Sequence, residues 1–236
     1  MGSRLTLVSR WSAVSASVTG SSHRARGEQG QDAVARRLLD DGTLVLAVAD
    51  GAGSAPLAAE GSALAVEAAV ALDAATTIED RFDAAHAALG GDAPSRATTL
   101  LVAVFGEHDL CVGHVGDGFV VARHVCSASY SVLVPAPERE YVNETTFLSS
   151  TNWRDDLRVE VVEALSVDGV ALLTDGLQLV AMELATSTPH APFFDPLFAW
   201  ATADGAGDDE LESFLSSDRL AARTDDDLTL ALAVRT

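Results

Sequence analysis

The sequence predicts an α+β fold: a central β-sandwich of two mainly antiparallel sheets, flanked by helices on both outer faces (α-β-β-α). Helical patterns fall into two blocks, near residues 57–90 and 176–217, and strand-like runs lie between and around them. Several of these runs are apolar on both faces, as expected of strands that are covered on both sides. Strands and helices do not alternate along the chain, which argues against a doubly wound α/β fold.

The first half of the chain combines strand-like and helical patterns. Apolar or alternating runs on both sides of Asp41-Gly42 are typical of a hairpin with a two-residue turn. The Ala-rich sequence that follows repeats its apolar residues about every 3.6 positions, as helices do. In order, we expect a strand at 5–16, a loop at 18–33, a hairpin at 33–50 and helices at 57–74 and 80–90.

The second half begins with three short apolar runs at close spacing, a pattern typical of an antiparallel meander. Pro135 and Pro137 then interrupt any regular element. We expect strands at 98–106, 109–116 and 119–125, an irregular segment at 127–157, a second hairpin at 159–175, helices at 176–186, 193–202 and 208–217, and a last strand at 227–234. No repeat or low-complexity linker divides the sequence, so residues 1–236 are expected to form a single domain.

Composition and charge exclude several classes of partner. The formal net charge of −20 argues against nucleic acid or anionic lipid as a direct partner. No run of 18 apolar residues is present, and the N-terminus lacks a secretory signal, so we expect neither a membrane span nor export. Cys111 and Cys126 lie in strand-like sequence and are expected to be buried free thiols, which favours a cytoplasmic location.

All fifteen basic residues are arginines, and the chain contains no lysine. A Walker-A lysine, a kinase strand lysine and a Schiff-base lysine are therefore all absent. The enzyme classes that depend on these groups are excluded.

Asp-Gly occurs six times, and three of these pairs end strongly apolar runs: Asp50-Gly51, Asp117-Gly118 and Asp175-Gly176. Because such runs predict buried strands, each pair places a carboxylate at a strand end. Asp-Gly is also the commonest two-residue hairpin turn, an interpretation that suits Asp41-Gly42 and Asp168-Gly169. Asp50-Gly51 and Asp175-Gly176 instead precede helix-like sequence, and Asp117-Gly118 is compatible with either interpretation.

Carboxylates near strand ends and loop edges form a candidate cation site. They are Asp32, Asp50, Asp117, Asp175 and the run Asp225-Asp226-Asp227. Gathered carboxylates repel one another unless a cation lies among them, and ligands that are all oxygen suit Mg²⁺ or Mn²⁺ more than zinc. The spacings typical of zinc sites are absent. Two hard cations roughly 3.5–4 Å apart would acidify a bridging water and clamp a phosphoryl group for in-line attack.

Four sequence blocks, in order, resemble the PPM/PP2C family of metal-dependent serine/threonine protein phosphatases, in a bacterial form. They are SSHRARGEQGQDA, LAVADGAGSAPLAAEGS, ATTLLVAVFGEHDLCVGHVGDG, and ALLTDGL with TDDDLTLALAV. EYVNETTFLSS further resembles a block found in a bacterial subgroup. The resemblance covers nearly the whole chain, and the joint order and spacing of the blocks are more specific than any one of them.

The resemblance implies a set of site residues and a reaction. Asp50 and the carbonyl of Gly51 would bridge and bind two Mn²⁺ or Mg²⁺ ions, and Asp175 and Asp226 would complete the second ion's site. Asp32 would face the first ion directly or through water, and Asp117 would bind a third, weaker ion. Asp32 and Asp50 would be the catalytic residues. A water bridging the two ions would attack the phosphorus of phosphoserine or phosphothreonine directly, without a phospho-enzyme.

The chain departs from the family pattern where the substrate phosphate would bind. Family members often carry an Arg five residues before the N-terminal Asp, and this chain has Gly27 there. Arg26 or Arg24 could replace it, because arginine binds phosphate in a bidentate manner. His23 is either a further phosphate contact or leaving-group acid, or a loop histidine with a capping role. Asp227 stands where the family has Asn, so Asp226 and Asp227 could exchange roles.

The main functional hypothesis is a phosphoprotein phosphatase whose substrates come from a Ser/Thr kinase, acting as a monomer and without nucleic acid or membrane partners. The missing Arg motivates an alternative, a catalytically weak pseudo-phosphatase that binds phosphoproteins as a signalling module. A hydrolase for small phosphate esters is a third possibility. The irregular segment 127–157 lies where family members carry a flap beside the active site, and we expect it to govern substrate choice. The charge of −20 favours basic phosphopeptides.

Overall fold

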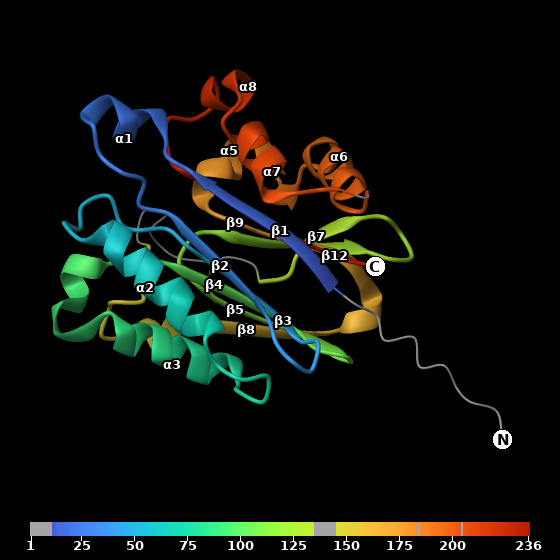
Figure 1. The fold of residues 1–236 in the computed structure, drawn as a ribbon, viewed down its shortest axis with the longest axis horizontal. Helices are drawn as coiled ribbons and strands as arrows, with labels where there is room; N and C mark the ends of the chain where they lie inside the picture. The colour runs from blue at the N-terminus through green and yellow to red at the C-terminus, as the bar shows by residue number, and fades with distance from the viewer. Residues whose placement is uncertain (1–10, 135–144, 184, 204) are drawn as a thin grey trace.

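The computed structural model describes residues 11–134, 145–183, 185–203 and 205–236. Two five-stranded antiparallel sheets pack face to face, in the orders β1-β12-β9-β6-β7 and β2-β3-β4-β5-β8 (Figure 1). The strands of the first sheet are β1 (Trp11–Val18), β6 (Phe119–His124), β7 (Tyr130–Val132), β9 (Val167–Leu173) and β12 (Leu228–Arg235). Those of the second are β2 (Ala33–Leu38), β3 (Leu44–Ala49), β4 (Leu100–Phe105), β5 (Asp109–Val115) and β8 (Arg158–Glu163).

Helices cover the outer face of each sheet (Figure 1). The β2-β3-β4-β5-β8 sheet is covered by α2 (Ala58–Val70) and α3 (Ile78–Ala88). The other sheet is covered by α5 (Gln178–Ala181), α6 (Ala191–Ala201), α7 (Asp208–Leu215) and α8 (Asp218–Ala221). The remaining elements are α1 (Ser21–Arg26), α4 (Trp153–Asp156), the 3-10 helices η1 (Gly90–Arg96), η2 (Ala164–Ser166) and η3 (Asp175–Leu177), and the short pair β10 (Met182–Glu183) and β11 (Thr188–Pro189).

Three apolar cores separate the four layers. Along β12, Leu230 and Leu232 point to the outer helices, and Ala231 and Ala233 point to the other sheet. The strands of the second sheet alternate in the same way, with Leu46 for example facing the sheet interface. Both faces of the central strands are therefore buried, which explains why their sequences are apolar at nearly every position. The predicted α-β-β-α architecture is confirmed.

Two local connections differ from the sequence prediction. The runs over β4, β5 and β6 do not form a single meander, because β5 pairs with β4 and β8, whereas β6 pairs with β7 and β9 in the other sheet. The predicted hairpin of β8 and β9 is likewise a crossing between the two sheets. Close spacing of apolar strands indicates adjacency along the chain, but the choice of sheet depends on which partners a strand finds after the turn. Asp117-Gly118 is therefore a crossing between sheets and not a hairpin turn.

Smaller elements also differ from the prediction. Asp168-Gly169 lies inside β9, where Asp168 pairs with Arg123 of β6, so the predicted turn there is wrong. Asp41-Gly42 does form the turn between β2 and β3, with Gly42 at φ 91°. The predicted loop at 18–33 contains the short helix α1, and the helix predicted at 176–186 is only one turn, α5.

Other sequence expectations have mixed outcomes. Both cysteines are free, but Cys111 is half-buried and Cys126 is exposed, because it lies just beyond the end of β6. Within the described residues, every helix is too short or too polar to cross a membrane. The first part of the strand predicted at 5–16, and residues 135–144 of the irregular segment, lie outside the described residues.

Candidate metal centre

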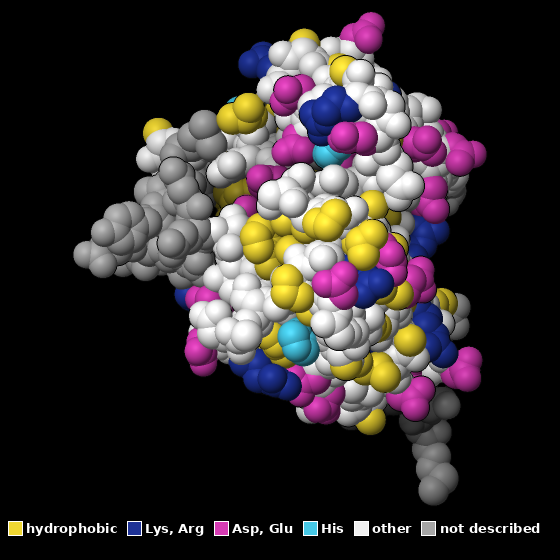
Figure 2. All heavy atoms as spheres, turned by 90° about the vertical axis from the view of Figure 1, so that its left-hand side faces the viewer, with side chains coloured by type: hydrophobic (Ala, Val, Ile, Leu, Met, Phe, Trp, Pro, Cys, Tyr) yellow, Lys and Arg dark blue, Asp and Glu magenta, His cyan; other side chains and the backbone are white. Residues whose placement is uncertain are grey.

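Three of the predicted carboxylates meet at one edge of the sandwich. Asp50 directly follows β3, Asp117 lies two residues beyond β5, and Asp175 lies two residues beyond β9. One ligand oxygen from each of the three residues lies within 4.8 Å of the others. The two sheets thus contribute acidic residues to the same point, although the strands that carry them are far apart in sequence. This edge is at the left of Figure 1 and faces the viewer in Figure 2.

Asp32 and Asp226 flank this cluster from the starts of two other strands. Asp32 directly precedes β2, and its Oδ2 accepts a hydrogen bond of 2.8 Å from the Thr174 hydroxyl. Its charge acts on Asp50, and the charge of Asp226, just before β12, acts on Asp175. The structure therefore brings together five of the seven carboxylates in the candidate cation site: Asp32, Asp50, Asp117, Asp175 and Asp226.

Burial and mutual repulsion raise the pKa of the clustered carboxyls. The pKa of Asp50 is raised first by burial and then by the charges of Asp32 and Asp175. Burial is also the main cause of the raised pKa of Asp32 and of Asp175, to which Asp227 and Asp117 respectively add. Such a group of acids favours either protons or a cation over the ionised, empty state.

Asp117 carries a buried oxygen that supports the same interpretation. Its Oδ2 accepts a hydrogen bond of 2.7 Å from the Thr145 hydroxyl. Its Oδ1 is buried and has no hydrogen-bond partner among the described residues. A buried carboxylate oxygen without a donor is costly, and a cation would compensate it. The oxygen donor set, the distances and this unpaired atom all fit a hard divalent cation.

Hydrogen bonds from two neighbouring segments hold the main chain at Asp50-Gly51. The Asp50 carbonyl accepts hydrogen bonds from the Thr99 amide (2.8 Å) and the Thr98 hydroxyl (3.0 Å), and the Gly51 amide donates to the Gln31 carbonyl (3.1 Å). A Cβ atom at Gly51 would lie 2.7 Å from the Ala58 carbonyl oxygen at the start of α2. Glycine is required because another backbone passes so close.

The hydrogen-bond partners of Asp227 distinguish it from its neighbour Asp226. The buried Asp227 carboxylate accepts hydrogen bonds from the amides of Gly20 and Gln31, both at 2.6 Å, and contacts His23 Nδ1 at 3.0 Å. These contacts tie the loop before α1, the segment leading to Asp32 and the start of β12 together. The geometry assigns Asp227 a supporting position and leaves Asp226 beside Asp175.

The candidate phosphate-binding residues all lie on α1. His23 is buried against Asp227, which favours its interpretation as a structural histidine over a phosphate contact. The exposed Arg24 donates to the Thr19 carbonyl, and the exposed Arg26 pairs with Glu28 at 2.6 Å. Neither arginine has a contact with the five carboxylates among the described residues.

Sequence reasoning missed the hydroxyl groups that position the acids. Thr98, Thr99, Thr145 and Thr174 each donate to, or accept from, one of the clustered aspartates or its main chain. Three of the four are buried. The available signal was their place at the ends of apolar runs, next to the acidic residues or opposite them in the sheet.

Comparisons with known proteins agree with this geometry and confirm the resemblance seen in the sequence. A family model described as protein phosphatase 2C matches residues 19–216. The chain is 32% identical over 257 residues to serine/threonine-protein phosphatase 3 of Escherichia coli K12, covering 95% of this chain and 98% of the relative.

Two solved structures share the fold. The serine/threonine phosphatase Stp1 from Staphylococcus aureus superposes with a TM-score of 0.69 at 15% identity, covering 99% of this chain and 98% of Stp1. RsbX in complex with magnesium superposes with a TM-score of 0.62 at 18% identity, covering 96% of each chain. The family match extends over most of the sequence and includes four of the five clustered aspartates. This chain belongs to the protein phosphatase 2C family.

Proposed function

We propose that this protein is a metal-dependent phosphatase that hydrolyses phosphoserine and phosphothreonine in proteins. The observation that carries the proposal is the convergence of Asp50, Asp117 and Asp175 within 4.8 Å in a chain of the protein phosphatase 2C family. The activity of the Escherichia coli relative supports the same reaction. The 2C match and the sandwich extend across the chain, which supports a single phosphatase domain over residues 1–236.

The chain's own groups suggest how Mn²⁺ or Mg²⁺ would bind. Asp50 and the carbonyl of Gly51 would lie between two ions, with Asp175 and Asp226 on one side and Asp32 on the other. Asp117, whose Oδ1 is unpaired, would serve a third ion. Such ions supply Lewis acidity, which lowers the pKa of a water and neutralises charge on a phosphoryl group. The cluster's raised pKa values imply that ion binding displaces protons.

Arg26 or Arg24 is proposed to bind the substrate phosphate. Both lie on a short helix that ends six residues before Asp32, and both arginines are exposed. An exposed ion pair such as Arg26–Glu28 contributes little stability, so Arg26 can leave Glu28 and bind a phosphate with little loss of free energy. His23 is proposed to act through Asp227 as a positioning residue.

The decisive experiment is turnover of a phosphopeptide and of p-nitrophenyl phosphate with Mn²⁺. We expect the activity to disappear in Asp50→Ala and to persist in Asp41→Ala, which removes the same residue type from an Asp-Gly pair in a hairpin turn. Wild-type activity no higher than that of Asp50→Ala would refute the proposal. Arg24→Ala and Arg26→Ala identify the phosphate contact, because the loss of that contact raises KM.

One observation favours the alternative of a pseudo-phosphatase. Gly27 replaces the family arginine, and both neighbouring arginines already have partners. Calorimetric titration with Mn²⁺ separates the two functions. Tight Mn²⁺ binding together with phosphopeptide turnover supports the enzyme, whereas phosphopeptide binding without turnover supports the signalling module.

The segment 127–157 is proposed to influence substrate choice. Thr145, just past the middle of this segment, donates directly to Asp117, so the segment contacts the acidic cluster. Exchanging the segment for that of another family member is expected to change relative rates on a panel of phosphopeptides. Unchanged relative rates would contradict the proposal.

A further inference from the structure

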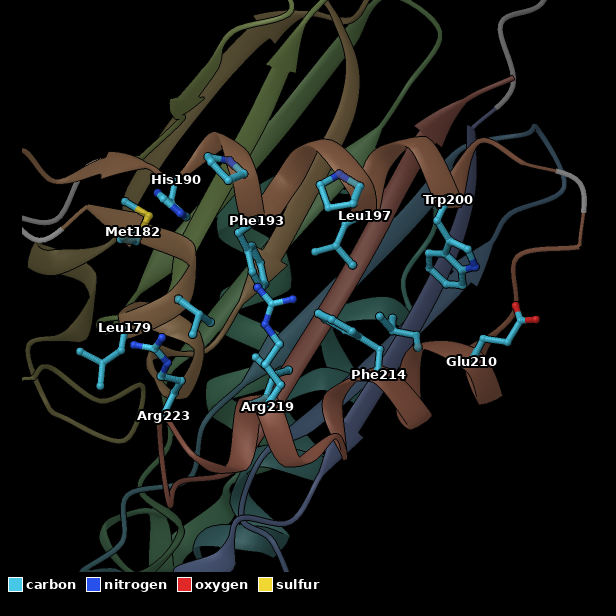
Figure 3. A pocket seen from close by; sticks show the side chains of 15 residues that line it. Leu179, Met182, His190, Phe193, Leu197, Trp200, Glu210, Phe214, Arg219 and Arg223 are labelled. Atoms are coloured by element: carbon cyan, nitrogen blue, oxygen red, sulfur yellow. The ribbon is translucent and has the colours of Figure 1, made fainter.

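The outer helix layer over β9 and β12 contains a cavity that is separate from the acidic cluster. It has a volume of about 520 Å³ and lies among α5, α6, α7 and α8 (Figure 3). None of the five clustered carboxylates lines it. Its walls are largely apolar and aromatic, with Phe193, Leu197, Trp200 and Phe214 along its length. A volume of this size lies in the range, roughly 300–1,000 Å³, that is typical of sites for small molecules.

The charges around this groove are unevenly distributed. Arg223 lies at the end near Leu179, Arg219 lies beside Phe193 in the same half of the groove, and Glu210 lies at the opposite end with Trp200 (Figure 3). Both arginines are exposed, and neither has an ion pair or side-chain hydrogen bond with another described residue. Glu210 is engaged, because its Oε2 accepts a hydrogen bond of 3.2 Å from the Gly207 amide. In a chain of net charge −20, the half of the groove away from Glu210 thus carries two guanidinium groups that form no ion pair with another described residue.

We propose that this groove binds a small, soluble amphiphilic anion. Its carboxylate or phosphate group would lie between Arg219 and Arg223, because guanidinium groups bind planar oxyanions in a bidentate manner. Its aliphatic or aromatic body would cover Phe193 and Phe214 and extend toward Trp200. The apolar walls supply affinity through burial, and the arginines at one end supply orientation and charge selectivity.

The groove is connected to the acidic cluster through short pieces of chain. Asp175 begins η3, which runs directly into α5 with the groove residues Leu179 and Val180. Arg223, just beyond α8, lies three residues before Asp226. A ligand that fixes α5 and α8 would therefore fix two of the five carboxylates. This coupling rests on the proposed metal-dependent function, whereas ligand binding itself does not.

Binding can be tested on the metal-free, full-length protein with 10-bromodecanoate, which quenches tryptophan fluorescence at short range. Trp200 lines the groove, while Trp11 and Trp153 are buried elsewhere. We expect saturable quenching that Trp200→Phe removes. Unbrominated decanoate should compete at about tenfold lower concentration than uncharged 1-decanol, the difference expected of a charge-assisted contact.

Variants at the cationic end test the charge selectivity. Arg219→Gln with Arg223→Gln should weaken decanoate binding about tenfold and leave decanol binding unchanged. Arg37→Gln, which removes an exposed arginine on β2, is the matched control and should bind decanoate normally. Equal affinity for decanoate and decanol, quenching that persists in Trp200→Phe, or binding only to phosphatidylglycerol vesicles or an acidic peptide would overturn the proposal.

Calorimetric titration of Mn²⁺ with and without saturating decanoate tests the coupling. We expect the Mn²⁺ Kd to change at least threefold, and the decanoate Kd to change by the same factor when Mn²⁺ is saturating. A blank titration of Mn²⁺ into decanoate corrects for direct association. Unchanged affinities with intact quenching would overturn the coupling alone. Absence of Mn²⁺ binding under both conditions would overturn the proposed function, and the quenching experiment would still decide the groove site.

Discussion

The two outer helix layers of this sandwich differ in the size of the side chains that they pack. On one side, α2 presents small residues, among them Gly61, where a Cβ atom would lie 2.3 Å from the Arg96 carbonyl oxygen. On the other side, α6 buries the large side chains Phe194, Leu197 and Phe198. Small residues let backbones approach closely and close the layer, whereas bulky aromatics separate the helices and leave a groove between α6 and α7.

The difference extends to the acidic cluster, since each layer supports part of it. The closed layer fixes Asp50-Gly51, because the start of α2 lies against Gly51. On the side of the open layer, Asp175 begins η3, which leads into α5, and Asp226 lies in the segment between α8 and β12. One part of the acidic cluster therefore lies on close-packed backbone, and the other part lies on segments that lead to the helices around the groove.

The largest expected effect is a difference between the two helix layers in the stability lost when a phenylalanine is truncated. Phe82 of α3 is fully buried, whereas Phe214 of α7 is half-buried at the groove. We expect Phe82→Ala to lower the free energy of unfolding by about 3–5 kcal/mol, and Phe214→Ala by about 1 kcal/mol, because only the first leaves a cavity in a closed core. Urea denaturation measures both. Equal losses would show that the two layers are equally well packed.

The next effect concerns the backbone contact that fixes the closed part of the site. Gly51→Ala should lower Mn²⁺-dependent kcat/KM about 100-fold, since an added Cβ displaces α2 or Asp50 by a fraction of an ångström or more. The control is Gly53→Ala, where the nearest atom to a new Cβ is a side-chain oxygen at 3.9 Å. Similar kinetics for the two variants would contradict this account.

A buried histidine makes the second sheet sensitive to acid. His114 of β5 shares a strand face with Leu110 and Val112, and burial lowers its pKa from 6.5 to about 4, with nearby Arg158 adding to the effect. The unfolded chain therefore protonates His114 more readily than the folded chain does. The contribution of neutral His114 to stability is complete above pH 6.5 and is lost as the pH falls toward 4. Between about pH 7 and pH 5 the loss should be about 2 kcal/mol.

Urea denaturation of the wild type and His114→Gln at several pH values measures this contribution. The difference between the two proteins should shrink as the pH falls, because glutamine does not titrate. The comparison also cancels the opposite trend of the acidic cluster, whose raised pKa values favour the folded state at low pH. A difference that is constant with pH would contradict the assignment to His114.

Local patterns predicted the layers of the fold, and they indicated aspartates that the structure places near one another. Strands such as β3 and β12 are apolar at almost every position because both faces are covered, and this signal is present in the sequence itself. Carboxylates at strand ends and loop edges indicated seven aspartates as a candidate cation site, because gathered charges of one sign need a compensating cation, and the resemblance to the family reduced this set to five. The convergence of three of them, Asp50, Asp117 and Asp175, within 4.8 Å is seen only in the structure.

The remaining features depend on contacts between distant segments. Whether β6 pairs with β5 or with β9 is decided by tertiary partners, and the sequence of the Asp117-Gly118 turn does not specify it. The division of roles between Asp226 and Asp227 depends on the amides of Gly20 and Gln31, about 200 positions away. The groove arises from how α6 and α7 pack, which periodicity alone does not predict.

The smallest expected effect tests the electrostatic cost of the empty acidic cluster. The charges of Asp32 and Asp175 add to burial in raising the pKa of Asp50, so the ionised cluster destabilises the metal-free fold, and increasingly so as the pH rises. Asp50→Asn should therefore stabilise the protein in EDTA by about 1 kcal/mol near neutral pH, with a gain that grows toward higher pH. In saturating Mn²⁺ the order should reverse, because only the wild type gains the full free energy of ion binding. Thermal unfolding under both conditions measures the reversal. The opposite result would be a variant that is less stable than the wild type in EDTA at every pH. It would show that groups of the closed layer stabilise the Asp50 carboxylate without a cation.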